Sequence, residues 1–183
     1  MDFQNLITQR QSVRKYTDQI IEKEKLTQCL EAARLAPSAS NSQPWKFTMV
    51  TENQKVKEVA AACFSDGKVI NKFALQVPAF VVITLEKARL ITRLAMMIKK
   101  KEWTLIDIGI TATHFCLQAA ELGLGTCMIG WFNDAKLRKA LDIPKDKTIA
   151  LVISVGYAPD DYPLRKKIRK SVDEVVSWEK YND

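Results

Sequence analysis

The side chains most able to bind a ligand lie between two prolines, Pro37 and Pro44. The stretch reads Ala-Pro-Ser-Ala-Ser-Asn-Ser-Gln-Pro-Trp-Lys-Phe over residues 36–47. Its short hydroxyl and carboxamide groups both donate and accept hydrogen bonds, so they could bind the polar edge of a planar heteroaromatic ring. Alternatively, these groups cap the backbone of their own turn, as Ser and Asn often do. Composition alone favours the second interpretation.

A second stretch near the N-terminus could bind an anion. Arg10-Gln11-Ser12-Val13-Arg14 places two guanidinium groups around a hydroxyl group. A guanidinium group binds phosphate through two parallel hydrogen bonds, which makes arginine a frequent phosphate ligand. An isolated Arg-x-Ser-x-Arg is, however, more often solvated surface.

Together the two stretches resemble the paired signature of the nitroreductase family of flavin enzymes. The matching elements are Arg-x-Ser-x-Arg at 10–14 and Pro-Ser-x-x-Asn-x-Gln-Pro-Trp at 37–45. The resemblance continues through Asp107-x-Gly109, residues 120–130 and the region from Val155 to Val176, so it covers nearly the whole chain. The chain departs from the family pattern at Gln11, at Trp131 and over residues 86–104.

The resemblance implies a fold and a function. The expected fold is α/β (α+β), a nitroreductase-like three-layer arrangement with a mixed, mainly antiparallel central sheet flanked by helices. One domain would span residues 1–183, and two copies would form an intertwined homodimer with extended C-terminal tails. The expected function is that of an FMN-dependent oxidoreductase in which NAD(P)H binds transiently. A small planar acceptor, of nitroaromatic or quinone type, would then be reduced at the same face in a ping-pong mechanism.

The resemblance also assigns roles to residues, all of them in cofactor binding. Arg14 would face the pyrimidine edge of the ring, where a cation stabilises the negative charge of the reduced flavin. The phosphate group would be bound by Arg10, Ser12, Lys167 and Arg169. The ring would be approached from the other subunit by Pro37, Ser38, Ser40, Asn41 and Gln43. Backbone groups of Met128, Ile129 and Gly130 would lie near N5, and neither a catalytic side chain nor a metal is expected.

Hydrophobic periodicity predicts the elements that position these residues. Helices are expected at 2–10, 22–36, 53–63, 86–98, 103–122 and 134–141, and strands at 45–51, 79–85, 126–130 and 148–156. The strands around Phe80–Ile83 and Ile149–Ile153 are apolar on both sides, so helices should cover both faces of the sheet. The tail after Gly156 is apolar enough to need a surface to cover, which the resemblance places on the partner subunit.

The long helix at 103–122 is apolar nearly all round and is therefore expected to be buried. Its small residues, Gly109, Ala112, Cys116 and Ala120, suit either a subunit interface or a monomer core. Asp107, at the start of this helix, is expected to interact favourably with the helix dipole and the first-turn N–H groups. The single histidine, His114, is expected to be structural because it lies mid-helix.

The unmatched stretch and the net charge leave two alternatives to the leading function. One is a specialised flavin reductase or dehydrogenase on the same scaffold, since residues 86–104 match no family pattern. The other is a polyanion-binding protein without catalytic activity, because the formal net charge is +7. The basic residues are scattered and lack interleaved aromatics, so no nucleic-acid partner is expected.

The cysteines and the apolar stretches indicate a cytoplasmic protein. The four cysteines lie far apart in apolar segments without metal-ligand spacing, so they are expected to be buried thiols in a reducing compartment. The longest apolar stretch, Phe73–Leu85, is too short to span a membrane.

Overall fold

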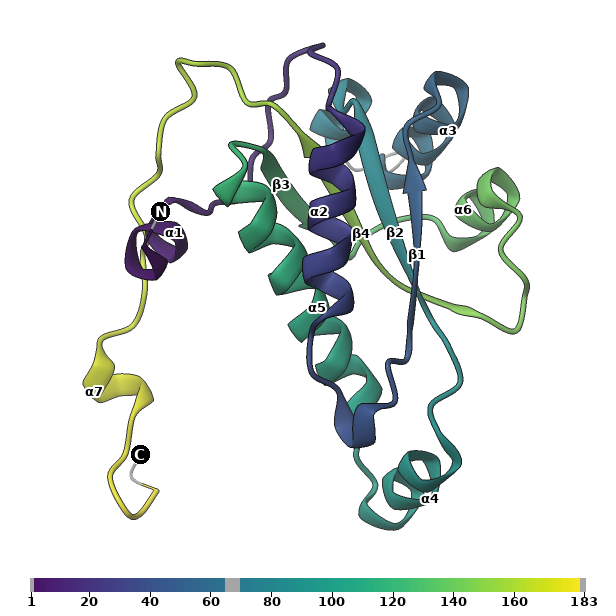
Figure 1. The fold of residues 1–183 in the computed structure, drawn as a ribbon, viewed down its shortest axis with the longest axis vertical. Coiled ribbons are helices and arrows are strands. Elements are labelled where there is room, and N and C mark those ends of the chain that lie inside the picture. Colours follow the sequence, from purple (N-terminus) through teal and green to yellow (C-terminus); the bar gives the residue numbers. More distant parts are fainter. Residues whose placement is uncertain (1, 65–69, 182–183) are drawn as a thin grey trace.

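The computed structural model describes residues 2–64 and 70–181, built around a four-stranded sheet (Figure 1). The strands are β1 (Trp45–Val50), β2 (Ala79–Leu85), β3 (Gly125–Ile129) and β4 (Thr148–Gly156), in the spatial order β1-β2-β4-β3. Every neighbouring pair is antiparallel. The four predicted strands are confirmed, each to within one residue at either end.

Residues near the N-terminus add a parallel contact to the free edge of β3. Ser12 forms an isolated parallel bridge with Thr126, and the Val13 N–H group donates to the Thr126 carbonyl oxygen at 2.9 Å. The sheet is therefore mixed but mainly antiparallel, as predicted. This contact fixes the Arg-x-Ser-x-Arg segment beside an edge strand.

Helices cover both faces of the sheet and complete three layers (Figure 1). On one face α2 (Lys23–Arg34) and α5 (Trp103–Glu121) pack with Val81 and Ile83, and on the other α3 (Asn53–Cys63) and α6 (Asp134–Leu141) pack with Phe80 and Val82. Successive side chains of a strand point to opposite faces, so one apolar run serves both cores. All four of these β2 side chains are fully buried. The predicted three-layer arrangement, a mainly antiparallel sheet flanked by helices on both faces, is confirmed.

The remaining elements lie around this body. They are α1 (Phe3–Gln9), the 3₁₀ turns η1 (Ala39–Asn41) and η2 (Lys72–Gln76), α4 (Leu90–Lys99) and the short α7 (Val172–Val175). Figure 1 shows α1 and the C-terminal tail with α7 set apart from the sheet, and α4 beyond the end of α5. The helix predicted at 86–98 begins four residues later than expected and ends at Lys99.

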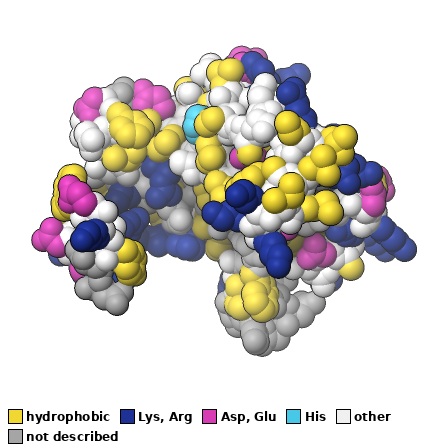
Figure 2. Space-filling view, turned by 90° about the horizontal axis from the view of Figure 1, so that it is seen from below, with side chains coloured by type: hydrophobic (Ala, Val, Ile, Leu, Met, Phe, Trp, Pro, Cys, Tyr) yellow, Lys and Arg dark blue, Asp and Glu magenta, His cyan; other side chains and the backbone are white. Residues whose placement is uncertain are grey.

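Several apolar faces are uncovered in the single chain. In α4 the polar Thr92 is buried, whereas Leu90 and Ile98 are 67% and 78% exposed. Trp178 in the tail is 78% exposed. Figure 2 views the molecule from the end that carries α4 and shows hydrophobic side chains gathered there, with Lys and Arg among them. Exposed apolar surface of this extent is typical of an interaction surface.

The prediction that α5 is buried all round is wrong for the single chain. The face with Ala112 and Cys116 is buried, but Ile106 is 60% exposed and Gly109 is exposed as well. Within the described part of the chain, the neighbouring elements cover only part of the helix, so Ile106 and Gly109 on its outer face stay exposed.

The expectation of buried thiols is confirmed for all four cysteines. Burial raises the pKa of the Cys29 and Cys63 thiols to about 12 each and that of Cys116 to about 11, so these thiols stay protonated at neutral pH. Among the described residues, none of the helices combines the length and the apolar character needed to cross a bilayer.

Candidate functional site

A pocket of about 190 Å³ is lined almost entirely by cations. Its lining residues are Arg10, Gln11, Ser12, Arg14, Arg165, Lys166, Lys167 and Arg169. The structure thus brings together the four residues predicted to bind phosphate, and Arg14 with them, although the two segments are about 150 positions apart in the sequence. In Figure 2 Lys and Arg side chains fill the recess between the tail and the main body.

Hydrogen bonds hold the two halves of this pocket against each other. The Gln11 side chain donates to the Pro163 carbonyl oxygen at 3.1 Å and accepts from the Arg165 N–H group at 3.0 Å. Arg165 also donates to the Ser12 carbonyl oxygen at 3.1 Å, and Lys167 donates to that of Arg10 at 2.6 Å. The tail therefore runs alongside residues 10–12, and the side chains of Gln11, Arg165 and Lys167 join the two segments.

Gln11 and Arg165 are site residues that sequence reasoning missed. From the sequence, Gln11 is only a departure from the family pattern, and Arg165 has no assigned role. Their role depends on the tail returning to the N-terminal segment, which local sequence does not encode. The signal available in the sequence was the side-chain amide of Gln11. It both donates and accepts hydrogen bonds, so it can join two backbone segments.

A glycine permits the close contact between the N-terminal segment and the sheet. A Cβ atom on Gly125 would lie 2.7 Å from Cγ2 of Val13, closer than packed carbon atoms allow. Gly123 has a φ of +77° and ends α5 in a turn, which is a common use of glycine at a helix C-terminus. Gly125 does something different: it leaves the space that Val13 occupies on β3.

The electrostatics of the pocket favour an anion. The pKa of Lys167 is lowered, first by its removal from water and then by the charges of Arg10 and Arg169. Within residues 2–64 and 70–181, no carboxylate forms an ion pair with the six cations of the pocket. Like charges held together repel one another, so a bound dianion would be stabilised by several of them at once.

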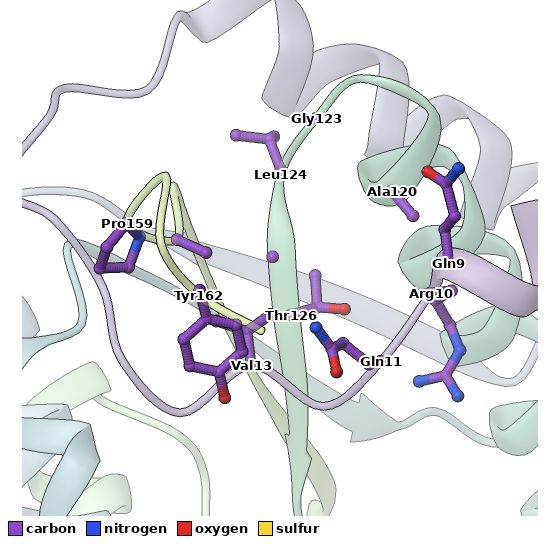
Figure 3. A pocket seen from close by; sticks show the side chains of 12 residues that line it. Gln9, Arg10, Gln11, Val13, Ala120, Gly123, Leu124, Thr126, Pro159 and Tyr162 are labelled. Atoms are coloured by element: carbon purple, nitrogen blue, oxygen red, sulfur yellow. The ribbon is translucent and has the colours of Figure 1, made fainter. Parts of the chain in front are cut away.

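A second hollow of about 180 Å³ lies on the other side of the same segment (Figure 3). Arg10 and Gln11 line both pockets, and Figure 3 shows Tyr162 across the hollow from Gln9 and Arg10. In this segment Val13 joins the core and Arg14 is exposed, while Arg10 and Ser12 are half-buried at the wall of the basic pocket. The polar groups of Arg10, Ser12 and Arg14 therefore border space that a ligand could enter.

The β3 residues predicted to line the ring follow directly from this edge. Met128 is 41% exposed, Gly130 is exposed and the Ile129 side chain is buried in the core. Among the described residues, nothing lies within 4 Å of a Cβ atom placed on Gly130. Because the Ile129 side chain is buried, only the backbone of Ile129 could contact a ligand at this strand.

The proline-bracketed loop has a strained and well-defined conformation. Ser40, Asn41 and Gln43 have φ angles of 51°, 50° and 47°, which non-glycine residues seldom adopt. The Ser38 hydroxyl accepts from the Gln43 N–H group at 2.9 Å, and the Gln43 side chain donates to that of Asn41 at 2.8 Å. The capping interpretation is thus confirmed for Ser38, and the Ser40 and Asn41 side chains are exposed.

The prediction that Asp107 serves the start of its own helix is wrong. The helix begins at Trp103, so Asp107 lies beyond the first turn, and it is only 3% exposed. Its Oδ1 atom accepts a hydrogen bond from the Ala39 N–H group at 3.1 Å, while Oδ2 is buried with no hydrogen-bond partner among residues 2–64 and 70–181. Burial raises the pKa of this carboxyl group, and the hydrogen bond from Ala39 partly offsets the rise.

The loop lies at the start of α5, whereas residues 10–14, which contribute to the basic pocket, run past the other end of this helix (Figure 1). Asp107 contacts the loop, whereas Ala120 lines the hollow beside Arg10. At 1.5 Å per residue, these two positions are roughly 20 Å apart along the helix. One chain therefore does not bring both halves of the predicted site to the same ring.

His114 takes no part in either half of the site. It is half-buried, and its Nδ1 atom lies 3.2 Å from the Ala32 carbonyl oxygen, which agrees with the structural role expected of it.

Comparison with known proteins extends the likeness over most of the chain. The sequence profile described as "Nitroreductase family" matches residues 7–157. The oxygen-insensitive NADPH nitroreductase of Helicobacter pylori strain J99 is 29% identical over 181 residues, covering 84% of this chain and 85% of that protein.

Solved structures give the same result for the fold. An FMN-dependent nitroreductase of Clostridium difficile R20291 is 30% identical, with a TM-score of 0.74 and coverage of 96% of this chain and 98% of that one. A nitroreductase family protein of Clostridium difficile 630 is 27% identical, with a TM-score of 0.80 and coverage of 99% and 100%.

Proposed function

Because the chain belongs to the nitroreductase family, we propose that it is an FMN-dependent oxidoreductase that uses NAD(P)H to reduce a small planar acceptor of nitroaromatic or quinone type. The names of its relatives support the donor and the cofactor. The observation that carries the proposal is the basic pocket, since it joins the Arg-x-Ser-x-Arg segment, the tail and the edge of β3 at one place.

The residues present fit the FMN phosphate group. Arg10, Ser12, Lys167 and Arg169 supply guanidinium, hydroxyl and ammonium donors around a space of about 190 Å³. The pKa of Lys167 is lowered first by removal from water and then by the charges of Arg10 and Arg169. A bound dianion would offset the repulsion between these cations, so Lys167 would hold its proton more firmly. The pocket is thus suited to a phosphate monoester more than to a neutral ligand.

When bound, FMN supplies hydride transfer between a donor and an acceptor that visit in turn. The chain supplies binding and electrostatics. Arg14 lies in the basic pocket, on the segment that runs beside β3, so its charge is available to the negative end of the ring. The exposed groups of Met128 and Gly130 would bound the far side, where the missing Cβ atom leaves room for a flat ring.

The loop would reach this ring from a second copy of the chain. In a symmetric homodimer, Ser40 and Asn41 of each copy would complete the site of the other, since they are too far from the basic pocket of their own chain. The exposed apolar faces of α4, α5 and the tail support this arrangement because a second copy would cover them. Each site would then need both chains.

Mixing two defective variants tests this arrangement. One variant carries Arg10→Ala and Arg169→Ala, and the other carries Asn41→Ala and Ser40→Ala. Each alone should bind FMN weakly, but a heterodimer regains one fully intact site of its two. In a refolded mixture of equal amounts, about half of the dimers are heterodimers. We therefore expect FMN to occupy about a quarter of all sites. Flavin absorbance after gel filtration measures this fraction. Absence of any gain on mixing would show that each chain forms its site alone.

The reaction itself is tested by steady-state kinetics. One pocket that serves both substrates gives parallel double-reciprocal lines when NADH or NADPH and a quinone are varied together. Intersecting lines would refute the shared pocket. A colourless protein that takes up no FMN, yet binds DNA in a salt-dependent way, would instead favour the polyanion-binding alternative.

A further inference from the structure

We propose that Asp107 is a positioning residue for the flavin site: its buried carboxylate holds the loop of residues 38–43 in the shape that meets the ring. The part of this inference that concerns the ring rests on the proposed function. The attachment of the loop to α5 is a property of the chain itself and can be measured without any flavin.

The contact joins two elements that are far apart in the sequence. Oδ1 of Asp107 accepts from the Ala39 N–H group at 3.1 Å, and Ala39 is the first residue of η1. Next to it, Ser40 and Asn41 have positive φ angles and exposed side chains. A loop in this strained conformation persists only where its surroundings hold it, so the carboxylate acts on the residues that present the ligand-binding groups.

A second buried polar group holds the other side of the loop. The hydroxyl groups of Ser42 and Thr92 lie 2.6 Å apart, and Thr92 is 1% exposed on the inner side of α4. Two helices thus attach to the two sides of η1, one through Asp107 and one through Thr92. Between them Ser40 borders an open cavity of about 340 Å³, which Asp107 and Trp103 also line.

The environment of Asp107 does not favour its presence for the sake of stability. Its Oδ2 atom is buried without a hydrogen-bond partner in the described part of the chain, and burial of an unpaired carboxylate is unfavourable. An apolar side chain of similar volume would avoid this cost. The benefit of the carboxylate is therefore that it fixes the geometry of the loop. A substitution of Asp107 should change this geometry without lowering the global stability, so an experiment can distinguish the two.

The test compares Asp107→Leu with Asp107→Asn, which keeps an acceptor oxygen for Ala39. Thr111→Val is the matched control: Thr111 lies one turn further along α5, is fully buried and donates to the Ala33 carbonyl oxygen at 2.6 Å, away from the loop. Three measurements are made on the full chain: amide hydrogen exchange of Ala39 without flavin, the FMN dissociation constant, and the midpoint potential of bound FMN.

We expect Asp107→Leu to speed exchange at Ala39 at least tenfold, to weaken FMN binding about tenfold or more and to shift the potential, with little change in Tm. Asp107→Asn should stay within about threefold of the unchanged protein in exchange and affinity. Thr111→Val should lower Tm but leave amide exchange at Ala39, the FMN dissociation constant and the midpoint potential unchanged.

Three results would overturn the inference. If Ala39 exchanges equally in Asp107→Leu, the carboxylate does not hold the loop. If exchange speeds up but affinity and potential stay constant, the loop is held but does not serve the ring. If Thr111→Val shifts affinity and potential as Asp107→Leu does, the effect is a general one of α5 stability. An unchanged protein that binds no FMN would disprove the proposed function instead, while the exchange data would still decide whether Asp107 holds the loop.

Discussion

Replacing Arg10 and Arg169 together by alanine is expected to release FMN from a chain that stays folded. Both side chains line the basic pocket, one from each of its two segments. A charge-assisted hydrogen bond is worth about tenfold in affinity or more, so loss of two should weaken FMN binding at least about a hundredfold. Neither residue is buried, so the thermal unfolding temperature should change little. Flavin fluorescence during dilution measures the affinity, and circular dichroism measures the unfolding.

The matched control removes two positive charges elsewhere. Lys23→Ala with Lys145→Ala alters the net charge equally, and both lysines are exposed and outside the basic pocket. This control should bind FMN as the unchanged protein does. If the Arg10 and Arg169 variant kept its full flavin content, the phosphate site would have to lie elsewhere on the chain.

The sheet and its covering helices could be predicted because their signals are local. Alternation at Trp45, Phe47 and Met49 and the apolar run at Phe80–Ile83 specify strands on their own. The helix of residues 134–141 was placed correctly too, since Asn133 caps it by accepting a hydrogen bond from the Lys136 N–H group. In each case a few neighbouring residues contain the whole signal.

The features that were missed depend on segments meeting in space. Nothing near Asp107 in the sequence indicates that its carboxylate will contact Ala39, which lies 68 residues earlier. An interaction with the helix dipole was therefore the only local explanation for an aspartate at this position. The same holds for Gln11 and Arg165, which join across the two ends of the chain. The outward face of α5 was misjudged because periodicity shows that a face is apolar but not which surface covers it. That surface is supplied by other chain segments or by a second copy.

Gly125 offers the second large effect, because it controls how the Arg-x-Ser-x-Arg segment meets the sheet. In Gly125→Ala the new Cβ atom would lie 2.7 Å from the Val13 side chain, which already packs in the core. Overpacking of this kind costs about 1–3 kcal/mol in the free energy of unfolding. The strain falls on the segment that carries Arg10, Ser12 and Arg14, so we expect FMN binding to weaken at least about tenfold. Denaturant unfolding and flavin titration measure the two effects.

A second substitution shows whether the clash itself is responsible. Val13→Ala removes Cγ1 and Cγ2, two of the three side-chain atoms that the new Cβ atom would meet, and leaves the Cβ atom of residue 13 at 2.9 Å. It keeps the backbone hydrogen bond from the residue 13 N–H group to Thr126. Alone it should destabilise the fold through a small cavity and still bind FMN. Combined with Gly125→Ala it should restore part of the affinity that the glycine substitution lost, because the contact to Cγ2 is the shortest of the three. The two changes would then be non-additive by about 0.5–3 kcal/mol, as expected for residues in direct contact. If the effects of the two substitutions on FMN affinity were additive, the contact between residues 125 and 13 would not be the cause. Gly125→Ala would then act through its own strand, β3.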